Sequence, residues 1–233
     1  KEKPPKLFYI VPDFQNPSGV TTGVAKRKRI AELAENHRFL ILEDAPYRFL
    51  RYRGENPPTF KELAPGNTIH ISSFSKIMSP GVRVGVLIGP PDIMPKLHKW
   101  SEDTYIHPAL VTEGIVYEYC RRGLLVPNIE KLKALYHPRM DCMLQMLETY
   151  MGDADYIKPE GGFFLSVTLP ATVDGRALQN NAEKFGIVLS DGSGFFTDGQ
   201  GDNFVRLPFC GITEEEIEVG VQRLAKAIAH YTI

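Results

Sequence analysis

Four short apolar runs, each followed by polar or turn-forming residues, restrict the fold of this chain more than any other feature. They are Leu7–Val11, Phe39–Leu42, Thr68–Ile71 and Val84–Ile88. Continuous apolar character is typical of strands that are covered on both faces, as in parallel sheets. Between the first two runs, residues 24–36 carry apolar side chains at helical spacing, and Thr21 or Thr22 is the expected cap. The first half therefore predicts an α/β fold.

The second half has a different pattern, with longer helical segments and shorter strands. Helical spacing covers 108–120, 127–150 and 174–185, and strand-like segments lie at 162–169, near Ile187 and near Phe204. A capping-box sequence, Thr213 to Glu216, starts the last helix. We therefore expect two domains: part of a large, mainly parallel sheet domain over 1–115, and a small α+β domain over 116–233, with a hinge near 105–125.

The first strand is expected to start after only six residues. A parallel sheet that opens so abruptly needs further strands on its other side. We expect those strands to lie upstream of Lys1, so that the chain is a piece of something longer.

Composition and charge exclude several classes of protein. Of the 233 residues, 43% are hydrophobic, which is enough to fill a sizeable core, and the net charge of −1 offers no general attraction for nucleic acid. The basic run Lys26–Arg29 is better explained as the solvated face of a helix. No apolar run is long enough to span a bilayer, so we expect no membrane partner.

The cysteines and histidines predict neither a disulfide framework nor a metal site. Cys120, Cys142 and Cys210 are odd in number and widely spaced, which favours a reducing compartment and a cytoplasmic location. The six histidines show no pairing at helical spacing, and we expect no metal.

Polar clusters that follow the apolar runs carry the chemistry. A pyridoxal phosphate site needs a lysine for a Schiff base, and an acidic partner that keeps the pyridine nitrogen protonated. Lys76 follows the third strand and Asp44 closes the second, so both are expected at one edge of the sheet. Tyr47 and Asn16 are suitable donors to the ring hydroxyl.

The phosphate of that cofactor needs hydroxyls and a guanidinium. Ser73, Ser75 and Arg83 supply these groups within a few residues of Lys76. Taken singly, each cluster is weak evidence, since Asn-Pro-Ser-Gly is usually a turn and a lone lysine is usually surface charge. Their order and setting together indicate a pyridoxal phosphate site.

The same motifs resemble the class I/II aminotransferases of fold type I, and within them the 2-aminoadipate and aromatic aminotransferase branch. The resemblance covers essentially the whole chain. It is carried by 15–19, 43–47, 72–76 with 80–85, 158–164 and 203–207. It implies a pyridoxal 5'-phosphate enzyme that moves an amino group between an α-amino acid and a 2-oxo acid by a ping-pong mechanism.

The resemblance also implies a role for each site residue. Lys76 would be the Schiff-base lysine and proton carrier, and Asp44 the partner of the ring nitrogen. Asn16 and Tyr47 would contact the ring oxygen, with Tyr47 also counted among the catalytic residues and Asn16 also among those that bind the substrate. Ser73, Ser75 and Arg83 would bind the phosphate, and Arg206 would hold the substrate α-carboxylate as a bidentate pair. The family's N-terminal half is missing from this chain, and a homodimer is expected from the resemblance alone.

Four other functions compete with this interpretation. Ser73 to Lys76 also spells S-x-x-K, but the Ser-Asp-Asn and Lys-Thr-Gly motifs of penicillin-binding enzymes do not occur. A dinucleotide site would need G-x-G-x-x-G after a strand, which is also lacking. Two alternatives stay open: the aminotransferase-like, cofactor-sensing domain of a transcriptional regulator, and a fold type I lyase.

Overall fold

The computed structural model describes residues 5–152, 154–190 and 192–232. The chain divides into two compact units, one made of Lys1–Asp13 and Thr21–Leu132, the other of Phe14–Val20 and Lys133–Ile233. This division falls inside helix α5 (Leu125–Tyr150), later in the chain than the boundary expected near residue 115. The assignment of two domains at 1–115 and 116–233 stays a prediction.

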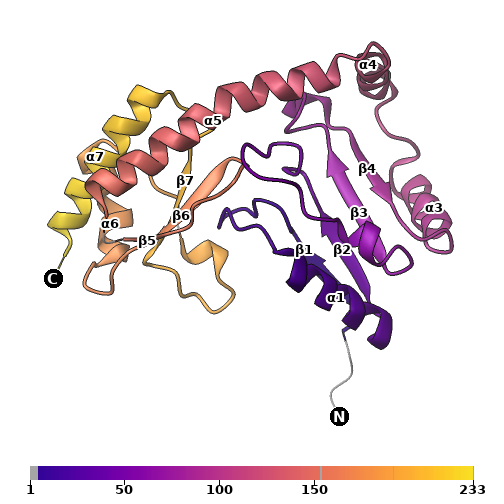
Figure 1. Cartoon of the computed structure of the whole chain (residues 1–233), viewed down its shortest axis with the longest axis horizontal. Helices are drawn as coiled ribbons and strands as arrows, with labels where there is room; N and C mark the ends of the chain where they lie inside the picture. The colour runs from indigo at the N-terminus through magenta and orange to yellow at the C-terminus, as the bar shows by residue number, and fades with distance from the viewer. Residues whose placement is uncertain (1–4, 153, 191, 233) are drawn as a thin grey trace. The chain divides into compact units, whose positions relative to one another are not determined.

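The first unit is built on a four-stranded sheet (Figure 1). Its strands are β1 (Leu7–Ile10), β2 (Leu40–Asp44), β3 (Thr68–Ser73) and β4 (Gly85–Ile88), in that spatial order. The first three strands run parallel, and β4 pairs antiparallel with β3. The four runs of the sequence thus become four strands, and the expected α/β fold with a mainly parallel sheet is confirmed.

One face of this sheet carries the core of the unit. Helix α1 (Val24–His37) and the short helix α2 (Phe60–Leu63) pack on it around the fully buried Ile41 and Phe60. The other face is less covered, and Leu7, Tyr9 and Leu87 are about half exposed. Within the described residues, β1 packs on the core only through Phe8 and Ile10, and all four residues of β4 are exposed, so burial on both faces is not observed for these two strands.

Several boundaries differ from the sequence expectation. The residue before α1 is Gly23, with no side-chain cap, and not Thr21 or Thr22. Helices α2 and α3 (Met94–Tyr105) were not expected. Helix α4 (Leu110–Arg121) and the helical turn η1 (Pro80–Val82) complete the unit. No helix among the described residues is both long and apolar enough to span a membrane.

A buried ion pair fixes the chain just beyond β1. Arg27 and Asp13 are both fully buried, and the Arg27 Nη2 lies 2.6 Å from the Asp13 Oδ1. The same guanidinium donates to the carbonyl oxygens of Pro12, Thr22 and Pro58. Because a buried charge is costly without partners, this set of bonds holds the loop after β1 in one conformation.

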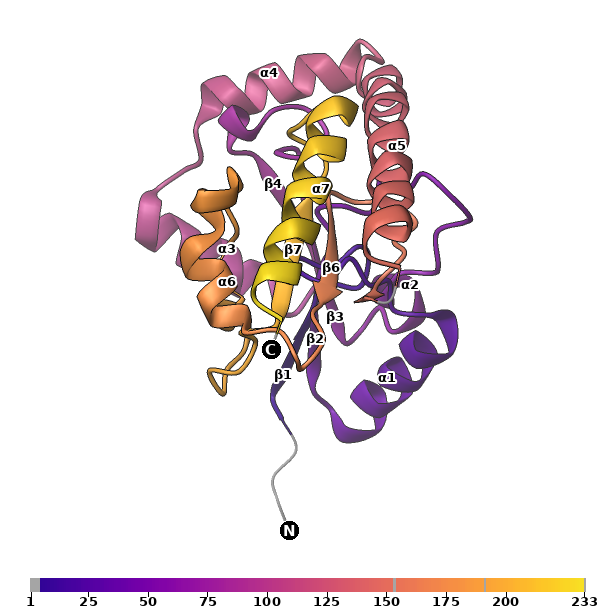
Figure 2. The same ribbon diagram turned by 90° about the vertical axis from the view of Figure 1, so that its left-hand side faces the viewer.

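The second unit holds a three-stranded antiparallel sheet of β5 (Asp155–Tyr156), β6 (Phe164–Thr168) and β7 (Phe204–Pro208). Helix α7 (Glu214–His230) runs beside α5, and Figure 2 shows the two helices side by side. The remaining elements are α6 (Gly175–Asn181), η2 (Ala182–Phe185) and η3 (Ser193–Phe195). The expected strand near Ile187 is wrong, since residues 187–190 pair with no strand among the described residues.

Candidate active site

Two predicted site residues lie where β2 ends. Asp44 is the last residue of β2 and is partly buried, and Tyr47 follows in the next turn and is buried. In the parallel pairing, Asp44 lies opposite Ile71, two residues before β3 ends at Ser73. The carboxyl ends of β2 and β3 therefore meet at one edge of the sheet, which is where ligands of such sheets bind.

A tyrosine on the neighbouring strand is tied to Asp44. The Tyr9 hydroxyl donates to the Asp44 Oδ2 at 2.7 Å. Partial burial of the phenol, followed by this hydrogen bond and the negative charge of Asp44, raises the pKa of Tyr9 to about 12, with a smaller contribution from Tyr47. Tyr9 therefore stays protonated, and remains a donor, at any neutral pH.

The turn between β3 and β4 holds four more predicted residues. Ser73 closes β3, and its Oγ accepts the backbone N–H of Ser75 at 3.1 Å. Lys76 lies in the turn that follows, and Arg83 follows η1, with its guanidinium on the carbonyl of Pro80. All four side chains thus belong to one hairpin loop.

Bonds at both sides of Lys76 fix that loop. The backbone N–H of Phe74 donates to the carbonyl of Val84, which closes the base of the hairpin. The Ile77 side chain is buried, and its carbonyl accepts the Nδ2 of Asn128 at 2.8 Å. Lys76 is therefore attached to a loop that is held from the sheet and from the start of α5.

The last two predicted residues contact one another in the second unit. The Arg206 Nη1, on β7, donates to the Asn16 Oδ1 at 3.0 Å. The guanidinium carbon lies 4.9 Å from the centre of the Phe164 ring and 5.2 Å from that of Phe195. The Arg206 Nε is buried and has no hydrogen-bond partner among the described residues. A buried donor left in this way suits an anion such as a carboxylate.

The segment that carries Asn16 is held against β6. Gly19 has a φ of +77°, and a Cβ at this position would lie 2.7 Å from the carbonyl oxygen of Phe164. Close by, the Ser166 Oγ donates to the Ser18 carbonyl at 3.0 Å. Only glycine permits both the backbone conformation and the close approach. Packing against β6 therefore requires glycine at the last position of the Asn-Pro-Ser-Gly turn.

Glu43 stands next to Asp44 but has a different environment. It is fully buried and accepts the backbone N–H groups of Phe60 and Lys61, at 2.8 and 3.1 Å, where α2 begins. The His70 Nδ1 lies 2.9 Å from the Glu43 Oε2, the oxygen that also accepts from Lys61. Glu43 therefore serves the packing of α2 on the sheet, while Asp44 faces the opposite side of the same strand.

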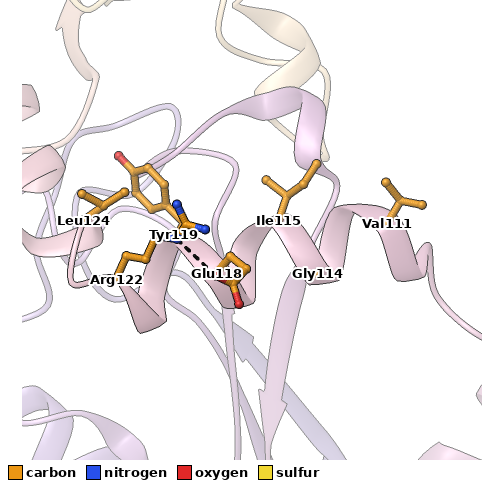
Figure 3. A pocket seen from close by; sticks show the side chains of 7 residues that line it. All are labelled: Val111, Gly114, Ile115, Glu118, Tyr119, Arg122 and Leu124. Atoms are coloured by element: carbon orange, nitrogen blue, oxygen red, sulfur yellow. Dashed lines mark hydrogen bonds and ion pairs between the residues drawn. The ribbon is translucent and has the colours of Figure 1, made fainter.

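Hollows elsewhere on the first unit hold little of this chemistry. One of about 600 Å³ runs along α4 and is lined by Val111, Ile115 and Glu118, with Glu118 paired to Arg122 (Figure 3). It contains no predicted site residue. A cavity of about 260 Å³ includes Ser73 in its lining. The candidate site is therefore defined by the strand ends and not by the hollow along α4.

Comparison with known proteins identifies the family. Residues 2–224 match the family model described as "Aminotransferase class I and II". The chain belongs to the class I and II aminotransferase family. This confirms the family resemblance drawn from the motifs.

Individual members of this aminotransferase family resemble nearly the whole chain. It is 37% identical to aromatic-amino-acid aminotransferase 1 of Thermococcus litoralis over 96% of its length and 54% of that protein. It is 30% identical to 2-aminoadipate transaminase of Thermus thermophilus, over 98% of the chain and 58% of the relative. The crystal structure of a multiple substrate aminotransferase from Thermococcus profundus is similar, with a TM-score of 0.93 and 38% identity, over 97% and 57% of the two chains.

The chain spans little more than half the length of these aminotransferases. The similarity in structure confirms the fold type I architecture over the part that is present.

Sequence reasoning missed three side chains that contact predicted site residues. Tyr9 was placed in a buried strand, and its bond to Asp44 depends on the register of β1 against β2. Phe164 and Phe195 flank Arg206, although they are 31 residues apart in the sequence. The motif around Phe164 was noted, but nothing in the local pattern of Phe195 indicates its contact with Arg206.

Proposed function

We propose that the protein is a pyridoxal 5'-phosphate-dependent aminotransferase that moves an amino group between an α-amino acid and a 2-oxo acid. The observation that carries the proposal is the pair of parallel strand ends in a chain of this family. Asp44 ends β2, and Ser73, Ser75 and Lys76 end or follow β3. An amine, a carboxylate and two hydroxyls on neighbouring strand ends form the donor set that this cofactor requires.

The residues of the first unit would hold the cofactor. Lys76 would hold its aldehyde carbon, and Asp44 would pair with the positively charged ring nitrogen. Ser73, Ser75 and Arg83 would bind the phosphate, since hydroxyls and a guanidinium are strong donors to phosphate oxygens. Tyr47 would donate to the ring oxygen, and Asn16 of the second unit is proposed for the same oxygen. When bound, the cofactor supplies an electron sink for the substrate's Cα.

Arg206 would bind the α-carboxylate of the substrate. Its guanidinium is oriented by Asn16 and flanked by two phenyl rings, and its Nε lacks a partner among the described residues. A planar guanidinium can bind a carboxylate through two parallel hydrogen bonds. Once the substrate has displaced the Lys76 amine from the cofactor, that amine would move a proton between the substrate's Cα and the cofactor's C4′ carbon, which is general acid–base catalysis.

We also propose a substrate class, a subunit state and a cellular location for the protein. Similarity to an aromatic-amino-acid aminotransferase and to a 2-aminoadipate transaminase supports an aromatic or 2-aminoadipate substrate. Assaying a panel of amino donors with 2-oxoglutarate would distinguish these substrates. Elimination products in the same assay would identify a lyase. We propose a homodimer, testable by sedimentation. A cytoplasmic location is supported by three cysteines without a disulfide, and is testable by fractionation.

The assignment of Lys76 is tested by trapping the cofactor covalently. After pyridoxal phosphate is added, reduction with borohydride and peptide mass mapping should place the adduct on Lys76. In Lys76→Ala, the adduct and steady-state transamination should both be lost, because no other amine would carry the cofactor and the proton. The exposed Lys96 of α3 offers a matched control, since Lys96→Ala should keep both. Transamination that persists in Lys76→Ala would overturn the proposal.

A further inference from the structure

The bond between Tyr9 and Asp44 joins two neighbouring strands on one face of the sheet. Tyr9 pairs with Leu42 in the parallel register, so Asp44 is its diagonal neighbour two residues further along β2. The Tyr9 hydroxyl donates to Oδ2 at 2.7 Å, and Oδ1 has no hydrogen-bond partner among the described residues. One carboxylate oxygen is therefore held, and the other is available.

We propose that Tyr9 is a positioning residue for Asp44, whose phenol holds Oδ2 so that Oδ1 is presented to the ring nitrogen of the cofactor. The inference rests on the proposed function, because it needs Asp44 to be the partner of that nitrogen. Tyr9 itself need not touch the cofactor.

The surroundings of Tyr9 favour a role through its hydroxyl over one in packing. The Tyr9 side chain is 56% exposed within this chain, and its hydroxyl is the group that contacts Asp44. Strands β1 and β2 are already joined along the whole of β1 by backbone pairing, from Leu7 with Leu40 to Ile10 with Glu43. The hydroxyl adds a charge-assisted bond to a carboxylate that is otherwise free to rotate about its own side-chain torsions.

The Tyr9 hydroxyl also keeps its proton at neutral pH and so remains a hydrogen-bond donor. The pKa of its phenol is raised to about 12, by partial burial first and then by the bond to Asp44 and its charge. The groups that act on it are Asp44 and Tyr47, which are both proposed to contact the cofactor ring. Tyr9 therefore belongs to the same set of side chains as the two residues assigned to the ring.

A titration without cofactor tests the contact itself. The difference in phenolate absorption between the wild type and Tyr9→Phe isolates the ionisation of Tyr9, which we expect near pH 12. The same difference, taken between Asp44→Ala and the double variant Asp44→Ala/Tyr9→Phe, should give a lower pKa, because the carboxylate has been removed. An unchanged pKa would mean that the two groups are not coupled, and would overturn the proposal.

Cofactor binding tests the positioning role. Tyr9→Phe should weaken the binding of pyridoxal phosphate about tenfold, as expected for losing a hydrogen bond to a charged group. Tyr105→Phe removes an exposed phenol from α3 and should leave the affinity unchanged. In the Asp44→Ala background, Tyr9→Phe should cost little more, since Tyr9 would act only through Asp44. Equal losses in both backgrounds would indicate a purely structural role and would also overturn the proposal.

The failures of the two proposals are distinguishable. If the wild type gives no borohydride adduct on Lys76, the proposed function fails, and the positioning role fails with it, even where the titration shows a coupled pair. If the adduct forms and Tyr9→Phe binds the cofactor as tightly as the wild type, only the role of Tyr9 is lost.

Discussion

Arg206 shows how single side chains prepare a binding group before any ligand arrives. One nitrogen of its guanidinium is held by Asn16, and its plane is flanked by Phe164 and Phe195. A guanidinium held by a hydrogen bond and by two aromatic rings has fewer orientations to lose when it binds a carboxylate. In the proposed role of Arg206, these contacts would make the carboxylate site preset, so that it would not have to form around its substrate.

Replacing one of the two rings should weaken substrate binding and leave the chemistry in place. In Phe195→Leu, the loss of one cation–π contact of about 0.5–1 kcal/mol should raise the KM for the amino donor about two- to fivefold, with kcat little changed. Steady-state kinetics on the active protein would measure it. Phe196→Leu is the matched control, since Phe196 packs on Phe204 and has no such contact with Arg206. Equal effects of the two variants would contradict the role given to Phe195.

Much of the candidate site could be predicted at the residue scale, because its members follow strands in short motifs. Lys76 and Asp44 were predicted at one sheet edge, and in the structure Asp44 ends β2 while Lys76 lies three residues beyond the end of the paired strand β3. Tyr9 could not be predicted in the same way, since its hydrogen-bond partner is 35 residues away and is set by the pairing of β1 with β2. Register is a property of the folded sheet, and an apolar run alone does not specify it.

At the scale of elements, helix α7 is the one whose start the sequence predicted best. Thr213 accepts the backbone N–H of Glu216, and the Glu216 carboxylate accepts that of Thr213, which is a complete capping box. The start of α1 was predicted less well, because Gly23 precedes it without any side-chain bond. A threonine near the start of a helical segment marks the first residue of the helix only where its side chain accepts a backbone N–H of the first turn.

Removing the cap of α7 should have a measurable cost. Thr213→Ala leaves the Glu216 N–H without its acceptor and should lower the free energy of unfolding by about 1 kcal/mol. Denaturation followed by circular dichroism would measure the change. Thr213→Ser retains the hydroxyl and should stay close to the wild type. If Thr213→Ala were as stable as Thr213→Ser, the capping box would not contribute.

At the scale of the whole molecule, the free energy of unfolding should decrease both at acid pH and at alkaline pH. Hydrogen bonds from Thr59 lower the pKa of Glu62, and pairing with Arg121 and Arg122 lowers that of Glu118. The pKa of Tyr9 is raised to about 12 from its ordinary value of 10.0. A lowered carboxyl pKa stabilises the fold above 4.5 and is lost in acid, while a raised phenol pKa stabilises it below 10.0 and is lost as the pH rises to about 12.

The urea midpoint of the wild type should therefore fall below pH 4.5 and again above pH 10.0. In Tyr9→Phe, the alkaline fall should be smaller, because the residue that resists ionisation in the folded state has been removed. The acid fall should be the same in both proteins. An identical alkaline fall would mean that the folded state does not hold the Tyr9 proton more tightly than the unfolded chain does.

Because Glu43 and Asp44 point to opposite faces of β2, substitutions at these two positions should have different effects on the protein. One carboxylate is buried against α2, and its neighbour, one residue on, faces the side of the sheet that carries Tyr9. Under the proposed function, Glu43 would be needed for folding and its neighbour Asp44 for turnover. In a saturation scan scored for both abundance and turnover, position 43 should lose abundance, whereas position 44 should keep abundance and lose turnover.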